Sequence, residues 1–176
     1  MSLTAILLIT LSAFAHAFWN YLSKRRDPST AFFWIATVAS AIVLLPLLAV
    51  FSQGLPFVSA LDWSLIVATG LCQAIYYVGL AGAYRNGDLS MAYPLARSLP
   101  VLLVALVSFM LGRGSQIGAL ALGGFILVAL GCLALPLPSF REFHFRHYLN
   151  LCCLFAVLAA IGTTGYTLID DQVLRN

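Results

Sequence analysis

Residues 31–51 read AFFWIATVASAIVLLPLLAVF, a mostly apolar run without a charged side chain. A helix of about 20 apolar residues spans the hydrocarbon core of a bilayer. The run gives way to Gln53 and Gly54, where a turn is expected. Its residues do not alternate between apolar and polar, as those of a membrane β-strand would. The run therefore predicts a membrane-spanning α-helix.

Five more runs of this kind lie along the chain, and turn-forming residues separate them. They cover residues 3–22, 63–84, 91–111, 117–135 and 149–169. The first looks like a signal peptide, but Lys24, Arg25 and Arg26 follow it rather than precede it, so we expect it to be retained. The sequence predicts an all-α membrane protein of about six transmembrane helices, placed as a multi-pass protein in the cell (inner) membrane.

The composition supports this class. The 176 residues carry nine Lys and Arg and six Asp and Glu, and 62% are hydrophobic. Only 9% are charged, against about 25% in soluble proteins. This excludes a soluble enzyme and a disordered chain, and the thinly spread net charge of +3 excludes a nucleic-acid-binding protein. The Lys and Arg bias of the connections favours an external N-terminus.

One charged residue, Arg97, lies inside a run, in the sequence MAYPLARSLP that begins at Met91. Tyr93, Arg97 and Pro100 share one helix face. Pro94 and Pro100 each remove a backbone donor, and helices interrupted in this way line cavities or pack against protein. Arg97 lies only about 10 Å from the start of its run. The alternative is that it snorkels to the interface or pairs with a nearby acidic residue.

Polar and aromatic stripes on other runs complete a candidate cavity. In the first run, His16 and Asn20 recur at helical spacing beside Trp19. His16 suits proton coupling or substrate binding, or alternatively a hydrogen bond that only joins helices. Such groups fit a small organic metabolite, and we expect no metal, cofactor or catalytic site, hence no enzyme. The candidate cavity-lining residues are His16, Trp19, Asn20, Gln73, Tyr77, Tyr93, Arg97 and Tyr166.

The fifth run carries small residues instead of a polar stripe. Gly123, Gly124 and Gly131 would let a neighbouring helix approach closely, so we expect a packing or dimerising helix. The four cysteines lie in membrane runs without zinc-site spacing, which indicates small apolar packing residues. His144 and His147 lie in a basic connection, which favours an interfacial patch over a metal site.

The ends of the first and sixth runs are weakly similar. Trp19 aligns with Tyr166, and Asn20 aligns with Thr167. Two helices at these positions in the order cross the membrane in opposite directions. Such a similarity is the pattern expected of an inverted repeat.

The chain resembles the EamA-like transporters of the drug/metabolite transporter superfamily. The resemblance rests on His16-x-x-Trp19-Asn20-x-x-x-Lys24, on residues 84–100, on the glycine-rich fifth run and on residues 165–170. It implies two five-helix repeats in opposite orientation around a central cavity, and export of small metabolites or drugs. Members often have both termini in the cytoplasm, so the orientation stays open.

Applied to this chain, the resemblance implies a five-helix repeat over residues 1–138, a loop over 139–148 and a sixth transmembrane helix over 149–176 that begins a second repeat. The family unit has ten helices. The chain is therefore a fragment, the product of a truncated or split gene, or a protein completed by a second copy or a second-half partner. We expect a secondary transporter, or an incomplete part of one, that exports by alternating access. The alternative is a non-transporting membrane subunit or scaffold.

Overall fold

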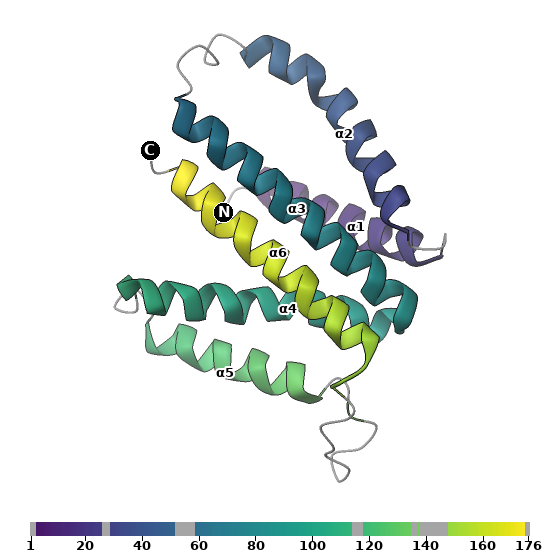
Figure 1. Ribbon diagram of the computed structural model, residues 1–176, viewed down its shortest axis with the longest axis vertical. Helices are drawn as coiled ribbons and strands as arrows, with labels where there is room; N and C mark the ends of the chain where they lie inside the picture. Colours follow the sequence, from purple (N-terminus) through teal and green to yellow (C-terminus); the bar gives the residue numbers. More distant parts are fainter. Residues whose placement is uncertain are drawn as a thin grey trace.

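A computed structural model describes residues 3–25, 29–51, 59–113, 118–134, 137 and 148–174 of the chain. Every regular element within these ranges is a helix, which confirms the all-α class (Figure 1). The helices in chain order are α1 (Leu3–Arg25), α2 (Thr30–Phe51), α3 (Ala60–Asn86), α4 (Leu89–Ser108), the π-helical turn η2 (Phe109–Arg113), α5 (Ala119–Ala134) and α6 (Leu151–Val173).

The helices agree closely with the predicted runs. Five of them are long and apolar enough to cross a membrane, and α5 is a shorter apolar helix. The predicted ends of the fifth run, residues 117 and 135, lie outside the described residues, as do loop residues 139–147 with His144 and His147. By the length and composition of its helices, the chain is a multi-pass membrane protein.

The structure shows how two of the helices begin and end. Ser59 caps α3, because its hydroxyl accepts from the backbone N of Asp62 at 3.1 Å while the Asp62 carboxylate accepts from the backbone N of Ser59.

In contrast to the expected interruption, α4 is continuous through Pro94 and Pro100. Each proline removes only one hydrogen bond, which neighbouring turns of a packed membrane helix tolerate. The turn η2 contains Gly112 at a φ of 77°, a backbone conformation that favours glycine.

Helices α3 and α6 form the tightest contact of the fold and lie side by side (Figure 1). A methyl group added at Gly79 of α3 would lie 2.7 Å from the Cα of Ala159 on α6. One added at Gly162 of α6 would lie 2.5 Å from the backbone N of Tyr76 on α3. The two backbones therefore touch, which only glycine permits at these positions. This contact, rather than any on α5, is where small residues bring helices together.

Among the described residues, the α5 glycines meet no neighbouring helix. Gly123, Gly124 and Gly131 are exposed, and a methyl group added at any of them would meet nothing within 4 Å. Small residues join two helices only where the partner presents its backbone, as α3 and α6 do. Contact with a second copy or another chain stays a prediction.

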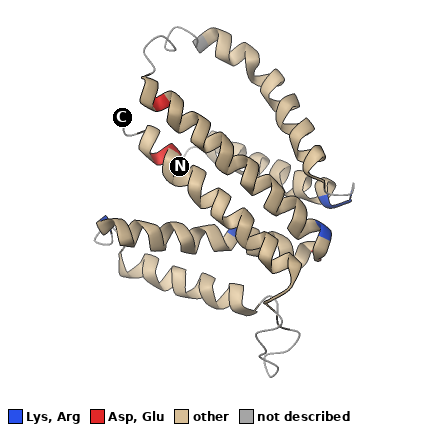
Figure 2. Ribbon diagram, viewed as in Figure 1, with Lys and Arg blue, Asp and Glu red and all other residues tan. Residues whose placement is uncertain are grey.

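Charged residues gather at the two ends of the bundle (Figure 2). Lys24, at the end of α1, lies beside the end of α3, which carries Arg85. At the opposite end, Asp171 of α6 pairs with Arg113 of η2 at 3.2 Å. Arg97 is the exception among the described residues, since it is the ninth residue of α4 and lies inside the helix. Such a distribution suits a protein whose middle lies in lipid.

Candidate functional site

A cavity of about 360 Å³ lies where five helices converge at the level of Arg97. Its volume falls in the range of small-molecule sites. Its walls combine hydroxyl, amide, imidazole, guanidinium and aromatic groups. The lining residues are His16, Trp19, Ala36, Thr37, Ser40, Gln73, Tyr76, Tyr77, Arg97 and Tyr166. Six of the eight predicted residues line it, namely His16, Trp19, Gln73, Tyr77, Arg97 and Tyr166.

Arg97 is the charged group of this cavity. Its guanidinium carbon lies 5.9 Å from the ring centroid of Tyr93, a cation–π distance. Its Nη2 contacts Nε2 of His16, and because a guanidinium can only donate, the imidazole nitrogen accepts. The expected alternative, an ion pair with an acidic residue, is not formed by Arg97 within the described ranges.

Asn20 and Tyr93 are the two predicted residues that do not line the cavity. Asn20 is buried between α1 and α3, where the Tyr84 hydroxyl donates to its Oδ1 at 2.7 Å. Its Nδ2 donates to the backbone oxygen of His16, also at 2.7 Å. Asn20 therefore joins two helices rather than facing a ligand. Tyr93 lies one helical turn before Arg97 and contacts the guanidinium with its ring.

A lysine fixes the position of α1 against α3. Lys24 Nζ donates to the backbone oxygen of Gly87 at 2.7 Å and to that of Tyr84. These carbonyls end α3, and a cation there also interacts favourably with the helix dipole. Ser23, fully buried beside it, donates to the backbone oxygen of Asn20 at 2.8 Å. Together these contacts set the level of His16, two helical turns before Lys24, opposite Arg97.

Aromatic side chains hold α2 and α6 at the cavity. Phe33 of α2 is fully buried, and its ring stacks on Tyr77 of α3 at 5.4 Å between centroids. Trp19 stacks on the neighbouring Phe32 at 5.2 Å. On the other side, Tyr166 of α6 meets Tyr76 edge to face at 6.2 Å. The cavity wall is thus continuous with the aromatic packing between helices.

Sequence reasoning missed four of the lining residues: Ala36, Thr37, Ser40 and Tyr76. Thr37 and Ser40 lie three positions apart on α2, so the pair of hydroxyls on one face was the available signal. Nothing in the apolar run set Phe33 apart from its neighbours, because burial against Tyr77 is a contact between distant segments.

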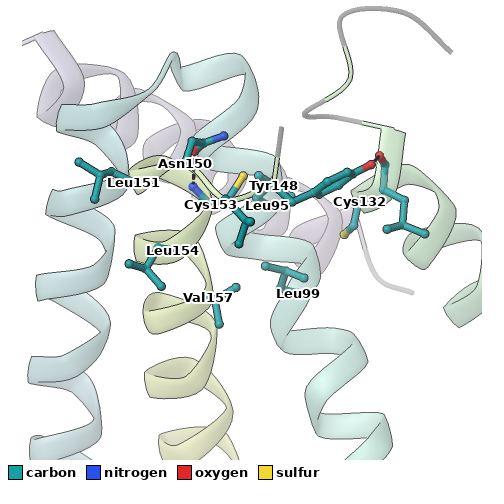
Figure 3. Close-up of a pocket in the computed structure, with 11 residues that line it drawn as sticks. Leu95, Leu99, Cys132, Tyr148, Asn150, Leu151, Cys153, Leu154 and Val157 are labelled. Atoms are coloured by element: carbon teal, nitrogen blue, oxygen red, sulfur yellow. Dashed lines mark hydrogen bonds between the residues drawn. The ribbon is translucent and has the colours of Figure 1, made fainter. Parts of the chain in front are cut away.

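Two further cavities lie on the other side of α4. One, of about 590 Å³, also has Arg97 in its wall and lies between α4, α5 and α6, reaching Arg113 and Asp171. The other, of about 460 Å³, is lined mainly by leucines and by Cys132 and Cys153 (Figure 3). In the latter, Asn150 is engaged as the cap of α6, where its Oδ1 accepts from the backbone N of Cys153 at 2.8 Å. Tyr148 also lines this space, and its hydroxyl donates to the backbone oxygen of Leu133. The described wall is therefore mostly apolar, and its polar groups make contacts within the chain.

Comparisons of the chain with family models, with curated proteins and with solved structures found no match. The class of protein therefore follows from the fold and the cavity alone. It is an all-helical, multi-pass membrane protein with a polar, aromatic cavity between its helices.

Proposed function

We propose that the chain is a secondary transporter, or a part of one, that exports small organic molecules across the cell membrane by alternating access. The observation that carries this proposal is the cavity at Arg97, to which five helices contribute side chains. Polar groups inside a membrane bundle are costly, so where they gather they mark a substrate or ion pathway. The six predicted residues that converge there come from four separate helices, α1, α3, α4 and α6.

The position of Arg97 supports transport of a bound molecule through the bundle. The residue lines the cavity that faces α1, α2 and α3, and also the cavity that faces α5. A substrate held by this guanidinium could therefore be reached from either space. Alternating access needs one site that two vestibules approach in turn. The resemblance to the EamA-like transporters, with Trp19 and Tyr166 both lining the cavity, is part of the same proposal.

A second candidate function follows from the exposure of the first two helices. Nearly all side chains of α1 and α2 are exposed, including Phe14, Ile35 and Val43. These surfaces face lipid or further helices, and helices of a second copy or a second repeat would bury them. The alternative is therefore a membrane subunit that transports nothing alone and requires a partner chain.

Cells that express the chain at matched levels test the transport proposal. The culture medium of cells with the wild-type chain is compared by untargeted mass spectrometry with that of cells expressing Arg97→Ala and His16→Ala. We expect compounds that accumulate in the medium with the wild-type chain and fall severalfold with either variant, because both side chains line the cavity. Uptake of these compounds into inverted membrane vesicles then measures transport directly.

Arg85→Ala is the matched control, since Arg85 is an exposed arginine at the end of α3, away from the cavity. It removes the same charge and should leave export unchanged. If the wild-type chain alters no compound in the medium, whether expressed alone or together with a second half, or if Arg97→Ala exports as well as the wild type, the proposal is wrong. Export that appears only when a second half is co-expressed would show that the chain is one part of a transporter.

A further inference from the structure

We infer that the molecule bound at Arg97 is an organic carboxylate carried on a planar ring. The inference rests on the proposed function, because it names the substrate class of the same cavity. It starts from the charge balance inside the bundle. An arginine within a membrane helix is stable when an opposite charge or hydrogen-bond acceptors compensate it. The structure shows what compensates Arg97 and what does not.

None of the described acidic residues forms an ion pair with Arg97. Asp62 and Asp88 lie at the N-termini of α3 and α4, and Asp170 and Asp171 lie near the C-terminus of α6. Asp88 is nine residues before Arg97, a rise of about 13 Å along the helix. Within the described ranges, the ion pair that forms is that between Arg113 and Asp171. The positive charge of Arg97 therefore has no acidic partner among the described residues.

The contacts that Arg97 does make do not neutralise its positive charge. Tyr93 offers the face of a ring, and His16 accepts through Nε2. Neither brings a negative charge, and a guanidinium has five donors to satisfy. An anion in the cavity would supply both the charge and the acceptors. A carboxylate matches the fork of a guanidinium with two parallel hydrogen bonds.

The amount of charge favours a carboxylate over a phosphate. One carboxylate balances one guanidinium, whereas a phosphate monoester carries about −1.5 to −2 and would leave an excess negative charge. That excess would be costly at membrane depth.

The rest of the wall favours a planar group attached to the carboxylate. Rings of Trp19, Tyr76, Tyr77 and Tyr166 line the cavity. Aromatic faces bind flat rings by stacking and edge contacts. The amide of Gln73 and the hydroxyls of α2 add a few oriented polar groups, which suits a substituted ring better than a flexible chain.

Ligand-induced thermal stabilisation of the purified full chain in nanodiscs tests the inference. The probes are two matched sets, benzoate with benzamide and benzylamine, and cinnamate with cinnamamide and cinnamylamine. Each set keeps the ring and changes the charge. We expect the carboxylates to raise Tm at concentrations about tenfold to hundredfold lower than the amides, which is the usual difference for a hydrogen bond to a charged group. The amines should not stabilise the chain.

Two variants assign the preference to Arg97. Arg97→Gln should bind acid and amide alike, and Arg85→Gln should behave as the wild type. If Arg97→Gln does not fold, Arg97→Lys, which keeps the charge but loses the fork, should retain a weaker preference for the acid. The inference is overturned if no acid stabilises the wild-type chain more than its amide, or if the preference survives in Arg97→Gln.

The outcomes separate this inference from the transport proposal. Carboxylates that bind at Arg97 but are not exported would contradict transport and leave the substrate class standing. Export of neutral or cationic compounds only, through an Arg97-dependent route, would support transport and overturn the substrate class.

Discussion

Replacing Gly162 with alanine would place a methyl group against the backbone of α3. Its Cβ would lie 2.5 Å from the N of Tyr76 and 2.7 Å from the O of Cys72, whereas ordinary van der Waals contact begins at 3.4 Å. Both are main-chain atoms, which cannot rotate away as a side chain could. Helices α3 and α6 must therefore separate by about 1 Å, and close-packed interiors resist such a shift.

Overpacking of this kind costs about 1–3 kcal/mol. For a chain of this length, that corresponds to a fall in Tm of about 2–12 °C. The separation would also displace Tyr166 from Tyr76, whose ring centroids lie 6.2 Å apart in the wall of the cavity. The measurement is the thermal unfolding of the purified chain in detergent, followed by the loss of the monodisperse peak in size-exclusion chromatography.

Gly123→Ala on α5 is the matched control, because nothing lies within 4 Å of the added methyl group. It should unfold at the wild-type temperature or slightly above it, since alanine favours a helix over glycine. Equal stability of Gly162→Ala and Gly123→Ala would refute the close approach of α3 and α6.

Three further substitutions test contacts that position the cavity, each by the same unfolding measurement. Tyr84→Phe leaves the buried Oδ1 of Asn20 without its donor and should cost about 1–3 kcal/mol; an unchanged Tm would show that this oxygen is satisfied otherwise. Lys24→Met removes the donor to the carbonyls at the end of α3 and should cost about 1.5–3 kcal/mol, and a loss below that range would mean the contact is weak. Asp171→Asn breaks the ion pair with Arg113. The side chains of Arg113 and Asp171 are 35% and 41% exposed, so the loss should cost less than about 1 kcal/mol.

The helices were predictable because membrane-spanning hydrophobicity is a local property. Each run of about 20 apolar residues specifies a helix whatever surrounds it, and the structure places helices at all six. Arg97 was predictable for the same reason, since a charge within an apolar run stands out on sequence alone.

The pairing of faces was less predictable, because it depends on contacts between distant segments. His16 and Asn20 share one face of α1, yet His16 faces the cavity while Asn20 faces Tyr84, 64 positions away. Likewise, the glycines of α5 read as packing residues, but Gly79 and Gly162 are the ones that meet a facing backbone. Periodicity defines a helix face, and the partner that covers it is a property of the whole fold.

A cysteine-labelling experiment tests the central claim, that the cavity at Arg97 is a hydrated space inside the membrane bundle. Gln73→Cys places a thiol in the cavity wall, and Leu71→Cys places one on the exposed lipid-facing side at nearly the same depth. Both are made in a chain whose four native cysteines are replaced by alanine. Opened membrane fragments, accessible from both sides, are treated with a charged thiol reagent that does not enter lipid and reacts only where water reaches the thiol. We predict labelling of Gln73→Cys and none of Leu71→Cys. Equal labelling of the two, or none of either, would contradict the cavity.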